Sequence, residues 1–355
     1  MNDKKLIWLA TNRLRLSPGS FREYYAKVFS PFQFPVDRFN LLPNIDPDTI
    51  QTVNIVPEPV YNLHNLTLDW YDRFVAICDD TAERVYQAAH SMPGCTIVIM
   101  YSGGIDSTAV LVAMMRSPHF KPFVDAGRLK VSLNSSGIYE YPELFYETIL
   151  PLIPIIPTDY NTIVADPNNF VITGDGGDHV ICSTDIPIFE YDGTTDIVNM
   201  DKKIIYNYFD NCDTSGKFSD MVRGIDKHAP FELHSVGQLC WWVSQCFTHQ
   251  CDMSYSFAWS SVDPAEIASF NKVFRFFLYP EFTTFSFEYM STNPAYTSLN
   301  SMRKFFKDYI IGHTGHEQYR SKNKIGSQRT TARKWHKTAI YEDLSYNNLT
   351  SIILS

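Results

Sequence analysis

The residues from Thr96 to Ser107, TIVIMYSGGIDS, place a buried strand, a glycine turn and the start of a helix in direct succession. The first part, TIVIM, is β-branched or long and apolar, which is typical of a strand buried in a parallel sheet. Ser-Gly-Gly then allows a sharp turn. Residues Ile105 to Arg116 are apolar and free of glycine, so we predict a helix there. Strand, turn and helix in this order indicate a parallel α/β fold.

The same alternation continues on both sides of this stretch. Before it, apolar residues recur at helical spacing from Leu66 to Met92, and Pro93-Gly94 ends the predicted helix. After it, we predict strands at Leu129–Leu133 and Phe170–Thr173, with a helix over Pro142–Leu152 between them. This alternation predicts a doubly wound α/β domain whose parallel sheet has about five strands.

The rest of the sequence divides the chain into four predicted parts. Residues 1–65 are rich in proline and are expected to form strands and turns. Residues 191–230 are polar and irregular, whereas helical patterns follow at Leu233–Phe247, Phe270–Leu278 and Ser298–Ile311. We therefore predict a small N-terminal region (1–65), an α/β core (66–190), a helical elaboration on the substrate side (191–300) and a C-terminal segment (301–355).

The overall composition predicts a packed cytoplasmic protein. Hydrophobic residues make up 45% of the 355 residues and aromatic residues 15%, which excludes an intrinsically disordered chain. No apolar run approaches the roughly 18 to 20 residues of a membrane helix, and no signal-peptide core is visible at the N-terminus. Seven scattered cysteines fit reduced thiols, and a net charge of −9 disfavours a general nucleic-acid binder. We expect no membrane partner.

The turn SGGIDS, from Ser102 to Ser107, has the chemistry of a pyrophosphate site. Gly103 and Gly104 let backbone amides approach an anion, while the hydroxyls of Ser102 and Ser107 add donors at a helix N-terminus, where the dipole favours negative charge. Asp106 would oppose an anion unless a cation bridges the two, so its presence implies Mg²⁺. The alternative is an ordinary strand-to-helix turn in which a serine caps the helix.

This hexapeptide resembles the signature of the PP-loop ATP pyrophosphatases. It is not a Walker loop, because no Gly-Lys-Ser or Gly-Lys-Thr follows, and it lacks the spaced glycines of dinucleotide-binding folds. The resemblance implies that the chain binds ATP and Mg²⁺ and that ATP is cleaved between its α and β phosphates. It also implies that the β and γ phosphates lie on Ser102–Ser107. The adenine is expected near Leu133, at the end of the second predicted strand.

A second glycine-rich turn, TGDGGD from Thr173 to Asp178, follows the third predicted strand. It resembles the corresponding loop of asparagine synthetase and β-lactam synthetase. Because the carboxyl ends of parallel strands share one edge, we expect Thr173 and Gly174 at the nucleotide, beside the first loop. By the resemblance, Asp178 completes a Mg²⁺ site with Asp106, and Asp175 acts as a base or an orienting group. The alternative is a glycine-rich surface turn.

A third segment, RSKNKIG from Arg320 to Gly326, resembles the C-terminal basic segment of asparagine synthetases. The resemblance implies that Lys322 is the catalytic lysine, which neutralises the phosphates, and that Arg320 makes a supporting contact. A positioned ammonium group stabilises the charge that develops on a leaving pyrophosphate. The alternative is a solvated basic stretch, because seven basic residues lie from Arg320 to Lys337.

Together these resemblances imply an asparagine synthetase-like ligase without the N-terminal glutaminase domain. Such an enzyme adenylates a carboxylate or amide-type oxygen of a small acceptor, releases pyrophosphate, and forms an amide with ammonia or an amine. No Cys follows Met1, so we expect the nitrogen donor to be free ammonia, an amine, or a separate glutaminase subunit. Two alternatives are a PP-loop enzyme that modifies a nucleobase of tRNA or DNA, and a non-catalytic ATP- or AMP-binding module.

Three further groups of residues each allow a functional and a structural interpretation. Side chains able to bind zinc occur at Cys240, Cys246, His249 and Cys251, although core thiols are the simpler interpretation because no Cys-x-x-Cys pair is present. Some aromatic residues belong either to the core or to an acceptor pocket: Trp241, Trp242, Phe247, Phe270, Phe274, Phe276 and Phe277. A basic group forms either a nucleic-acid contact or a solvated tail: Arg329, Arg333, Lys334, Trp335 and Lys337.

Overall fold

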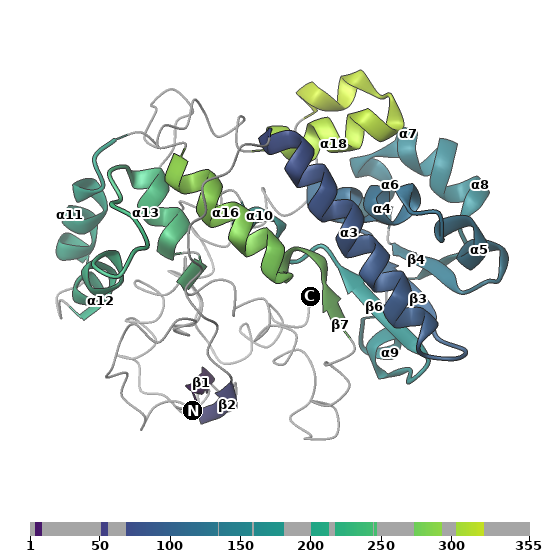
Figure 1. Cartoon of the computed structure of the whole chain (residues 1–355), viewed down its shortest axis with the longest axis horizontal. Coiled ribbons are helices and arrows are strands. Elements are labelled where there is room, and N and C mark those ends of the chain that lie inside the picture. Colours follow the sequence, from purple (N-terminus) through teal and green to yellow (C-terminus); the bar gives the residue numbers. More distant parts are fainter. Residues whose placement is uncertain are drawn as a thin grey trace.

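The structure is a computed structural model that describes residues 4–8, 51–55, 69–133, 135–157, 160–180, 200–212, 217–243, 245–246, 273–292 and 303–322. In this part of the chain, helices surround a five-stranded sheet (Figure 1). A separate antiparallel pair is formed by β1 (Lys4–Trp8) and β2 (Gln51–Ile55). Among the described helices, none has the length and apolar character needed to cross a bilayer.

The larger sheet is parallel throughout, with the strand order β5-β4-β3-β6-β7. Its strands are β3 (Thr96–Met100), β4 (Leu129–Leu133), β5 (Ile155–Pro157), β6 (Asn169–Thr173) and β7 (Val273–Arg275). This confirms the predicted α/β fold with a parallel sheet of five strands. The chain runs outward from β3 through β4 to β5, and then β6 pairs with the other side of β3. The order therefore reverses between β3 and β6, and open parallel sheets bind ligands at such a reversal.

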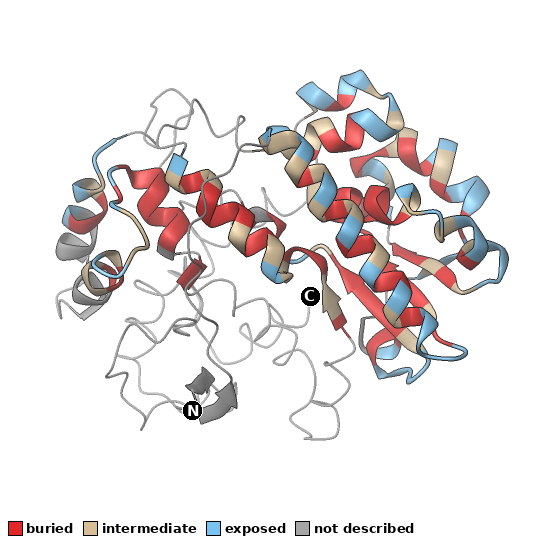
Figure 2. Ribbon diagram, viewed as in Figure 1, coloured by how far each residue is buried: buried red, intermediate tan, exposed pale blue. Residues whose placement is uncertain are grey.

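Helices cover both faces of the sheet because the strand side chains alternate between two cores. Ile97 and Ile99 face the larger core, which includes α3 (Trp70–His90) and α4 (Ile105–Arg116). Val98 faces the smaller core, where it clusters with residues of β6, β7 and α9 (Tyr160–Ala165). Figure 2 shows buried residues running along the strands and along the inner sides of the helices.

Helix α3 ties the sheet to the helices that follow it late in the sequence. It begins where the Asp69 carboxylate accepts hydrogen bonds from the N–H groups of Tyr71 at 2.8 Å and Asp72 at 3.3 Å. On its inner side, the ring of Phe74 packs among aromatic rings of α16 (Pro280–Thr292) and α18 (Lys304–Thr314): Phe282, Phe285, Phe305, Phe306 and Tyr309.

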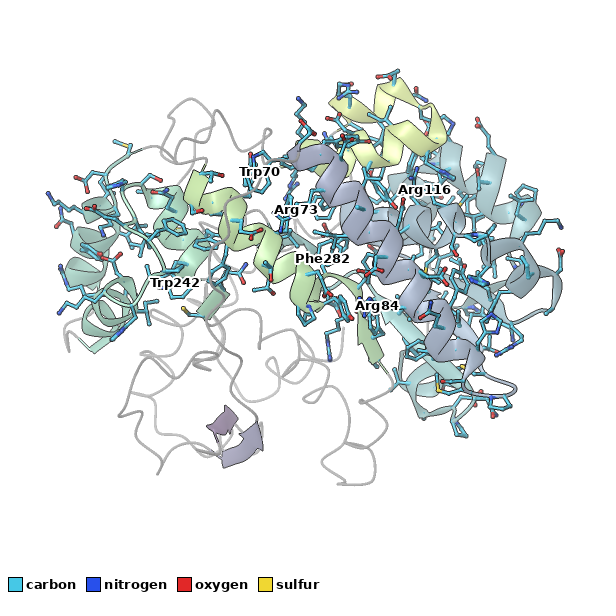
Figure 3. All side chains as sticks on the ribbon, viewed as in Figure 1. Trp70, Arg73, Arg84, Arg116, Trp242 and Phe282 are labelled. Atoms are coloured by element: carbon cyan, nitrogen blue, oxygen red, sulfur yellow. The ribbon has the colours of Figure 1, made fainter. Side chains whose placement is uncertain are left out.

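An ion pair also joins α3 to α16. Arg73 pairs with the buried carboxylate of Glu288, and its guanidinium lies 5.8 Å from the ring centroid of Trp70. In Figure 3, Trp70 and Arg73 lie along the part of α3 that faces α16, and Phe282 lies on α16. Apolar and charged contacts thus hold α16 against α3.

The predicted crossover helices are present between β3 and β5. Helix α4 has the bounds predicted for it, and α5 (Phe120–Asp125) follows before β4. The helix predicted over residues 142–152 is a run of three short pieces: α7 (Pro142–Leu144), the π-helical turn η3 (Phe145–Ile149) and α8 (Leu150–Leu152). Another short helix, α6 (Ser135–Glu140), precedes them.

The helix predicted over Phe270–Leu278 is wrong where the structure describes it. Val273–Arg275 forms β7, and Phe276–Leu278 forms the 3₁₀ turn η6. Val273 joins the smaller core, whereas Phe274 packs near Phe170 beside the larger one. This alternation between two faces is the period of a strand, and β7 adds to the core sheet from within the range predicted as a helical elaboration.

The irregular structure predicted for residues 191–230 is also wrong in part. Helices α11 (Lys203–Cys212) and α12 (Lys217–Asp226) form there and pack near α13 (Val236–Val243). Each helix carries a narrow apolar stripe among its polar residues. The buried members of these stripes are Ile205 and Tyr206 in α11 and Val222 and Ile225 in α12. Polar helices of this kind are stable because the stripe is covered by a neighbour.

Candidate functional site

The first glycine turn joins β3 to α4 and is held by its own serine hydroxyls. Ser107 Oγ accepts a hydrogen bond from Ser102 N at 3.2 Å and donates one to the Gly104 carbonyl at 3.1 Å. The two serine hydroxyls are 3.0 Å apart, and Ser107 is buried whereas Ser102 is exposed. Gly103 has φ = 74°, a conformation that favours glycine. Ser107 therefore shapes the turn, and Ser102 is the hydroxyl accessible from outside.

The N-terminus of α4 has the features of an anion site. Gly104 is its N-cap and has no side chain with which to cap the first-turn N–H groups. Asp106 lies in this first turn and Thr108 N closes it by donating to the Gly104 carbonyl at 3.0 Å. The turn thus offers a positive helix end next to one carboxylate, which is the combination predicted for phosphate and Mg²⁺.

The second glycine turn joins β6 to the short helix α10 (Gly177–Val180). The hydroxyl of Thr173, the last residue of β6, donates to Asp175 Oδ2 at 2.7 Å. Gly176 has φ = 87° and Gly177 N donates to the Gly174 carbonyl at 3.3 Å. Thr173 therefore orients the exposed carboxyl group of Asp175 at the carboxyl edge of the sheet.

The two turns are in direct contact. A Cβ atom on Gly174 would lie 2.8 Å from Ser107 N and 2.9 Å from the carbonyl carbon of Asp106. A Cβ atom on Gly177 would lie 2.5 Å from Asp106 Oδ1. All three distances are shorter than a Cβ atom normally tolerates, so this close approach of the two turns requires glycine at positions 174 and 177. The Asp106 carboxylate consequently lies against the start of α10, at the reversal of strand order.

The loop after β4 reaches the same edge from the other side of β3. A Cβ atom on Gly103 would collide with the carbonyl oxygen of Gly137 and would lie 2.6 Å from Glu140 Cβ. Leu133 is the last residue of β4 and its side chain is buried. Strand β4 lies between β3 and β5 in the sheet. The ends of β3, β4 and β6 therefore meet around Ser102–Ser107, and Gly174 lies against the first turn. The predicted nucleotide contacts of Leu133, Thr173 and Gly174 stay predictions.

The C-terminal segment reaches this edge through stacked tyrosines. The 3₁₀ turn η7 (Glu317–Ser321) carries Tyr319, whose buried ring stacks on Tyr141 with 4.3 Å between the centroids. Burial is the main cause that raises the pKa of Tyr319 above its usual range, and the charge of Asp106 adds to it. The Tyr141–Tyr319 stack is a feature that motif analysis missed.

Lys322, the predicted catalytic lysine, follows η7 directly. Its Nζ lies 3.5 Å from Glu143 Oε2 and 5.0 Å from the centroid of the Tyr141 ring. Lys307 Nζ donates to the carbonyl of Lys322 at 3.1 Å and to that of Arg320 at 2.8 Å, which holds the backbone of this segment. Lys322 therefore sits beside the loop after β4, paired with a carboxylate.

Arg320 turns towards α18 instead of towards the glycine turns. It forms ion pairs with Asp308 of α18 and, at 3.5 Å, with Glu317. Its side chain is about half exposed, at 51%. These ion pairs hold η7 against α18. The supporting contact of Arg320 with phosphate stays a prediction.

Several predicted site residues lie outside the described part of the chain. Asp178 belongs to α10, but its side chain is not among those described. His249, Cys251, Phe247, Phe270 and the basic group from Arg329 to Lys337 also lie outside. Within the described residues, no group of three or more His, Cys, Asp or Glu is arranged to hold a metal ion. The Asp106–Asp178 pair therefore stays a prediction.

The described thiols of the zinc candidate, Cys240 and Cys246, are buried, and so are Trp241 and Trp242. Burial raises the pKa of Cys240 to about 12, so this group is a neutral thiol. The indole N–H of Trp241 donates to Ser286 Oγ at 2.8 Å and that of Trp242 to the Ile225 carbonyl at 2.7 Å. Both tryptophans belong to the core, with their polar atoms satisfied.

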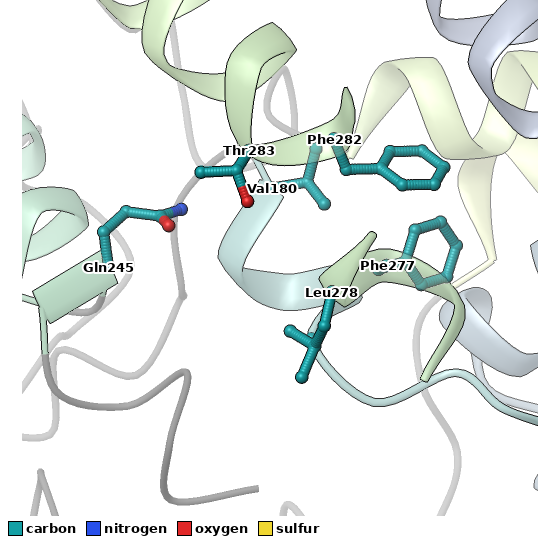
Figure 4. Close-up of a pocket in the computed structure, with 7 residues that line it drawn as sticks. Val180, Gln245, Phe277, Leu278, Phe282 and Thr283 are labelled. Carbon is teal, nitrogen blue, oxygen red and sulfur yellow. The ribbon is translucent and has the colours of Figure 1, made fainter. Parts of the chain in front are cut away.

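A small pocket adjoins the second glycine turn (Figure 4). Its cavity volume is about 10 Å³, far below the roughly 300–1,000 Å³ of pockets that enclose drug-sized ligands. It is lined by Gly176, Val180, Gln245, Phe277, Leu278, Phe282 and Thr283. Of the predicted pocket aromatics that the structure describes, Phe277 is in this lining. The cavity has room for about one water molecule and not for a nucleotide.

Comparison with protein-family models, curated proteins and solved structures finds no match. The geometry of the two glycine turns and the resemblance of their sequences are therefore the observations that bear on function.

Proposed function

We propose that the chain binds ATP and Mg²⁺ at the edge between β3 and β6 and is an AMP-forming, asparagine synthetase-like ligase. The observation that carries this proposal is the contact between Asp106 and Gly177, which joins the two glycine turns at the reversal of strand order. Either turn alone would suit an ordinary loop. Their contact supports a single site that combines a phosphate cradle with carboxylates.

The residues of the first turn fit the phosphate groups of ATP. The uncapped N–H groups at the start of α4 and the exposed hydroxyl of Ser102 would bind the β and γ phosphates. Asp106, with Asp178 as the second candidate ligand, would hold Mg²⁺. When bound, Mg²⁺ neutralises phosphate charge and favours departure of pyrophosphate. The chain's own contribution is to position the phosphates and to keep the carboxylates close to them.

Lys322 is our candidate for stabilising the leaving pyrophosphate. Glu143, the Tyr141 ring and the Lys307 contact to its backbone restrict its position in this structure. An ammonium group restricted in this way stabilises developing negative charge without reorganising. Glu143 would have to release Lys322 when the phosphates bind, because one ammonium group cannot remain paired with both.

The proposed reaction has two steps. An acceptor carboxylate oxygen attacks the α phosphorus of ATP, the bond to the bridging oxygen breaks, and pyrophosphate leaves with the bonding electrons. A nitrogen nucleophile then attacks the acyl carbon, AMP leaves, and the nitrogen loses a proton. Asp175, oriented by Thr173, is our candidate to accept that proton. The net products are an amide, AMP and pyrophosphate.

Product analysis tests this proposal directly. We expect the protein, incubated with ATP, Mg²⁺ and a metabolite extract supplemented with ammonia, to release AMP and pyrophosphate in equal amounts, measured by ³¹P NMR. ADP and phosphate as the products would contradict the ligase mechanism. ATP binding without turnover would instead support a binding module, and release that requires added tRNA or DNA would support nucleobase modification.

Replacing Gly174 by Ala should separate the two turns. The new Cβ would lie 2.8–2.9 Å from backbone atoms of Asp106 and Ser107, which cannot move aside as a side-chain tip can. A shift of about 1 Å in a reacting group can cost about a hundredfold in rate, so we expect AMP formation to fall by about that factor. The measurement is the rate of pyrophosphate release.

Gly312→Ala is the matched control for this substitution. Gly312 lies in α18 and its new Cβ would meet only the Tyr71 hydroxyl, at 3.2 Å. We expect this variant to keep the wild-type rate. Equal rates in Gly174→Ala and wild type would show that close approach of the turns is not needed for activity.

A further inference from the structure

Arg275 is the last residue of β7. Strand β7 is the neighbour of β6 on the side away from β3, so Arg275 lies one strand further along the sheet edge than the two glycine turns (Figure 1). Two of its guanidinium nitrogens, Nε and Nη2, are buried and have no hydrogen-bond partner in the described residues. It also forms no ion pair with any described carboxylate. Arg275 as a whole is half-buried. Because a guanidinium group stays charged in proteins, Arg275 is a cation with two buried donors and no described anion beside it.

The strand register places Arg275 beside the second glycine turn. Thr173 and Arg275 are partners in the β6–β7 pair. The residues two positions earlier, Val171 and Val273, share the smaller core, so Thr173 and Arg275 also project from that face. The turn after β7 touches the turn after β6 as well, because a Cβ on Gly176 would collide with the side chain of Leu278.

Arg73 also has one unpaired buried nitrogen, but its guanidinium forms an ion pair with Glu288. Two other partly buried arginines in the described residues, Arg116 and Arg128, donate to acceptors. Arg116 makes two hydrogen bonds of 2.8 Å to the carboxylate of Asp79. Arg128 donates to the carbonyls of Cys95 at 2.9 Å and Ala89 at 3.0 Å. Leaving guanidinium donors buried and unpaired costs free energy, which an anion bound during function would recover.

We propose that Arg275 binds an oxyanion of a reactant, either a phosphate of the nucleotide or a carboxylate of the acceptor. This inference rests on the proposed function, since it extends the same strand-end site by one strand. The guanidinium presents paired N–H donors that match both kinds of oxyanion. Arg275 lies one strand beyond β6 and pairs in register with Thr173, so it gives the site a cation on the side of β6 away from β3, β4 and Lys322.

Anion binding to Arg275→Gln and Arg275→Lys tests the inference, with Arg84→Gln as the control. Arg84 is an exposed arginine of α3 that pairs with Asp80, so its replacement removes the same charge elsewhere. Isothermal titration with ATP and Mg²⁺, with pyrophosphate and with succinate measures each affinity. Loss of a charged hydrogen-bonded pair predicts roughly 10- to 100-fold weaker binding in Arg275→Gln and a smaller loss in Arg275→Lys.

The pattern of losses identifies the source of the oxyanion. Weaker binding of ATP and pyrophosphate with unchanged succinate binding assigns Arg275 to the nucleotide phosphates, and the reverse pattern assigns it to the acceptor. Equal binding of all three probes by wild type and Arg275→Gln, or no binding by either, overturns the inference. Circular dichroism and thermal unfolding of each variant separate loss of binding from loss of folding.

The same titrations distinguish this inference from the proposed function. Failure of wild type to bind ATP with Mg²⁺ would defeat the proposed function, while a succinate affinity lost in Arg275→Gln would still support an oxyanion site. Tight ATP binding that Arg275→Gln leaves unchanged, together with unchanged binding of succinate, would defeat only the role of Arg275.

Discussion

Asp106→Asn is expected to lower AMP-forming ATP turnover about a thousandfold, the upper part of the range for removing one electrostatic group from an active site. The substitution keeps the size and planarity of the side chain, so its contact with Gly177 is retained. It removes the negative charge through which Asp106 would hold Mg²⁺. The measurement is kcat for pyrophosphate release at saturating ATP.

Asp72→Asn is the matched control for Asp106→Asn. Both residues are acidic and lie in the first turn of a helix, where each interacts with the positive end of the helix dipole. The control therefore reproduces the effect of the substitution on helix stability but leaves the candidate Mg²⁺ site unchanged. Electron paramagnetic resonance with Mn²⁺ adds a second readout, in which only Asp106→Asn should lose metal binding. Wild-type turnover in Asp106→Asn would exclude a metal role for this carboxylate.

Phe74→Ala should lower the free energy of unfolding by about 3–5 kcal/mol. The Phe74 side chain is fully buried and contacts rings of both α16 and α18. Removing the Phe74 ring leaves a cavity among the surrounding aromatic rings. These rings cannot fill the cavity unless whole helices move. Urea denaturation followed by circular dichroism measures the change.

Tyr139→Ala is the control for that measurement. Tyr139 is an aromatic residue of α6 that is 71% exposed, so its loss should change stability by less than about 0.5 kcal/mol. A loss below about 1 kcal/mol in Phe74→Ala would contradict the packing described around this ring. Such a result would mean that α16 and α18 are held by other contacts.

The parts of the fold that were predictable are those with local signals. TIVIM followed by two glycines defines β3 and the turn, and the bounds of α4 follow from its apolar residues and its lack of glycine. Thr173 and Gly174 could be placed next to Ser102–Ser107 because the carboxyl ends of parallel strands share an edge. Short-range chemistry and one general rule were therefore enough for the centre of the candidate site.

The parts that were not predictable depend on contacts between distant residues. Val273–Arg275 is too short to show a strand period against the aromatic residues around it, and only pairing with β6 makes it a strand. The stack of Tyr141 on Tyr319 joins segments far apart in sequence, and no local pattern signals it. Arg275 carries no motif, since what marks it is the absence of a partner among the described residues.

The late position of β7 in the chain has a consequence for biosynthesis. Residues 174–272 separate it from its partner β6, and at about 5–20 residues per second the ribosome needs roughly 5–20 s to make them. During that interval β6 can pair with β3 but has an open outer edge, a template for pairing with another nascent chain. We expect a chain stalled shortly after β6 to require chaperones, and the strand-end site to be completed only after β7 has left the ribosome.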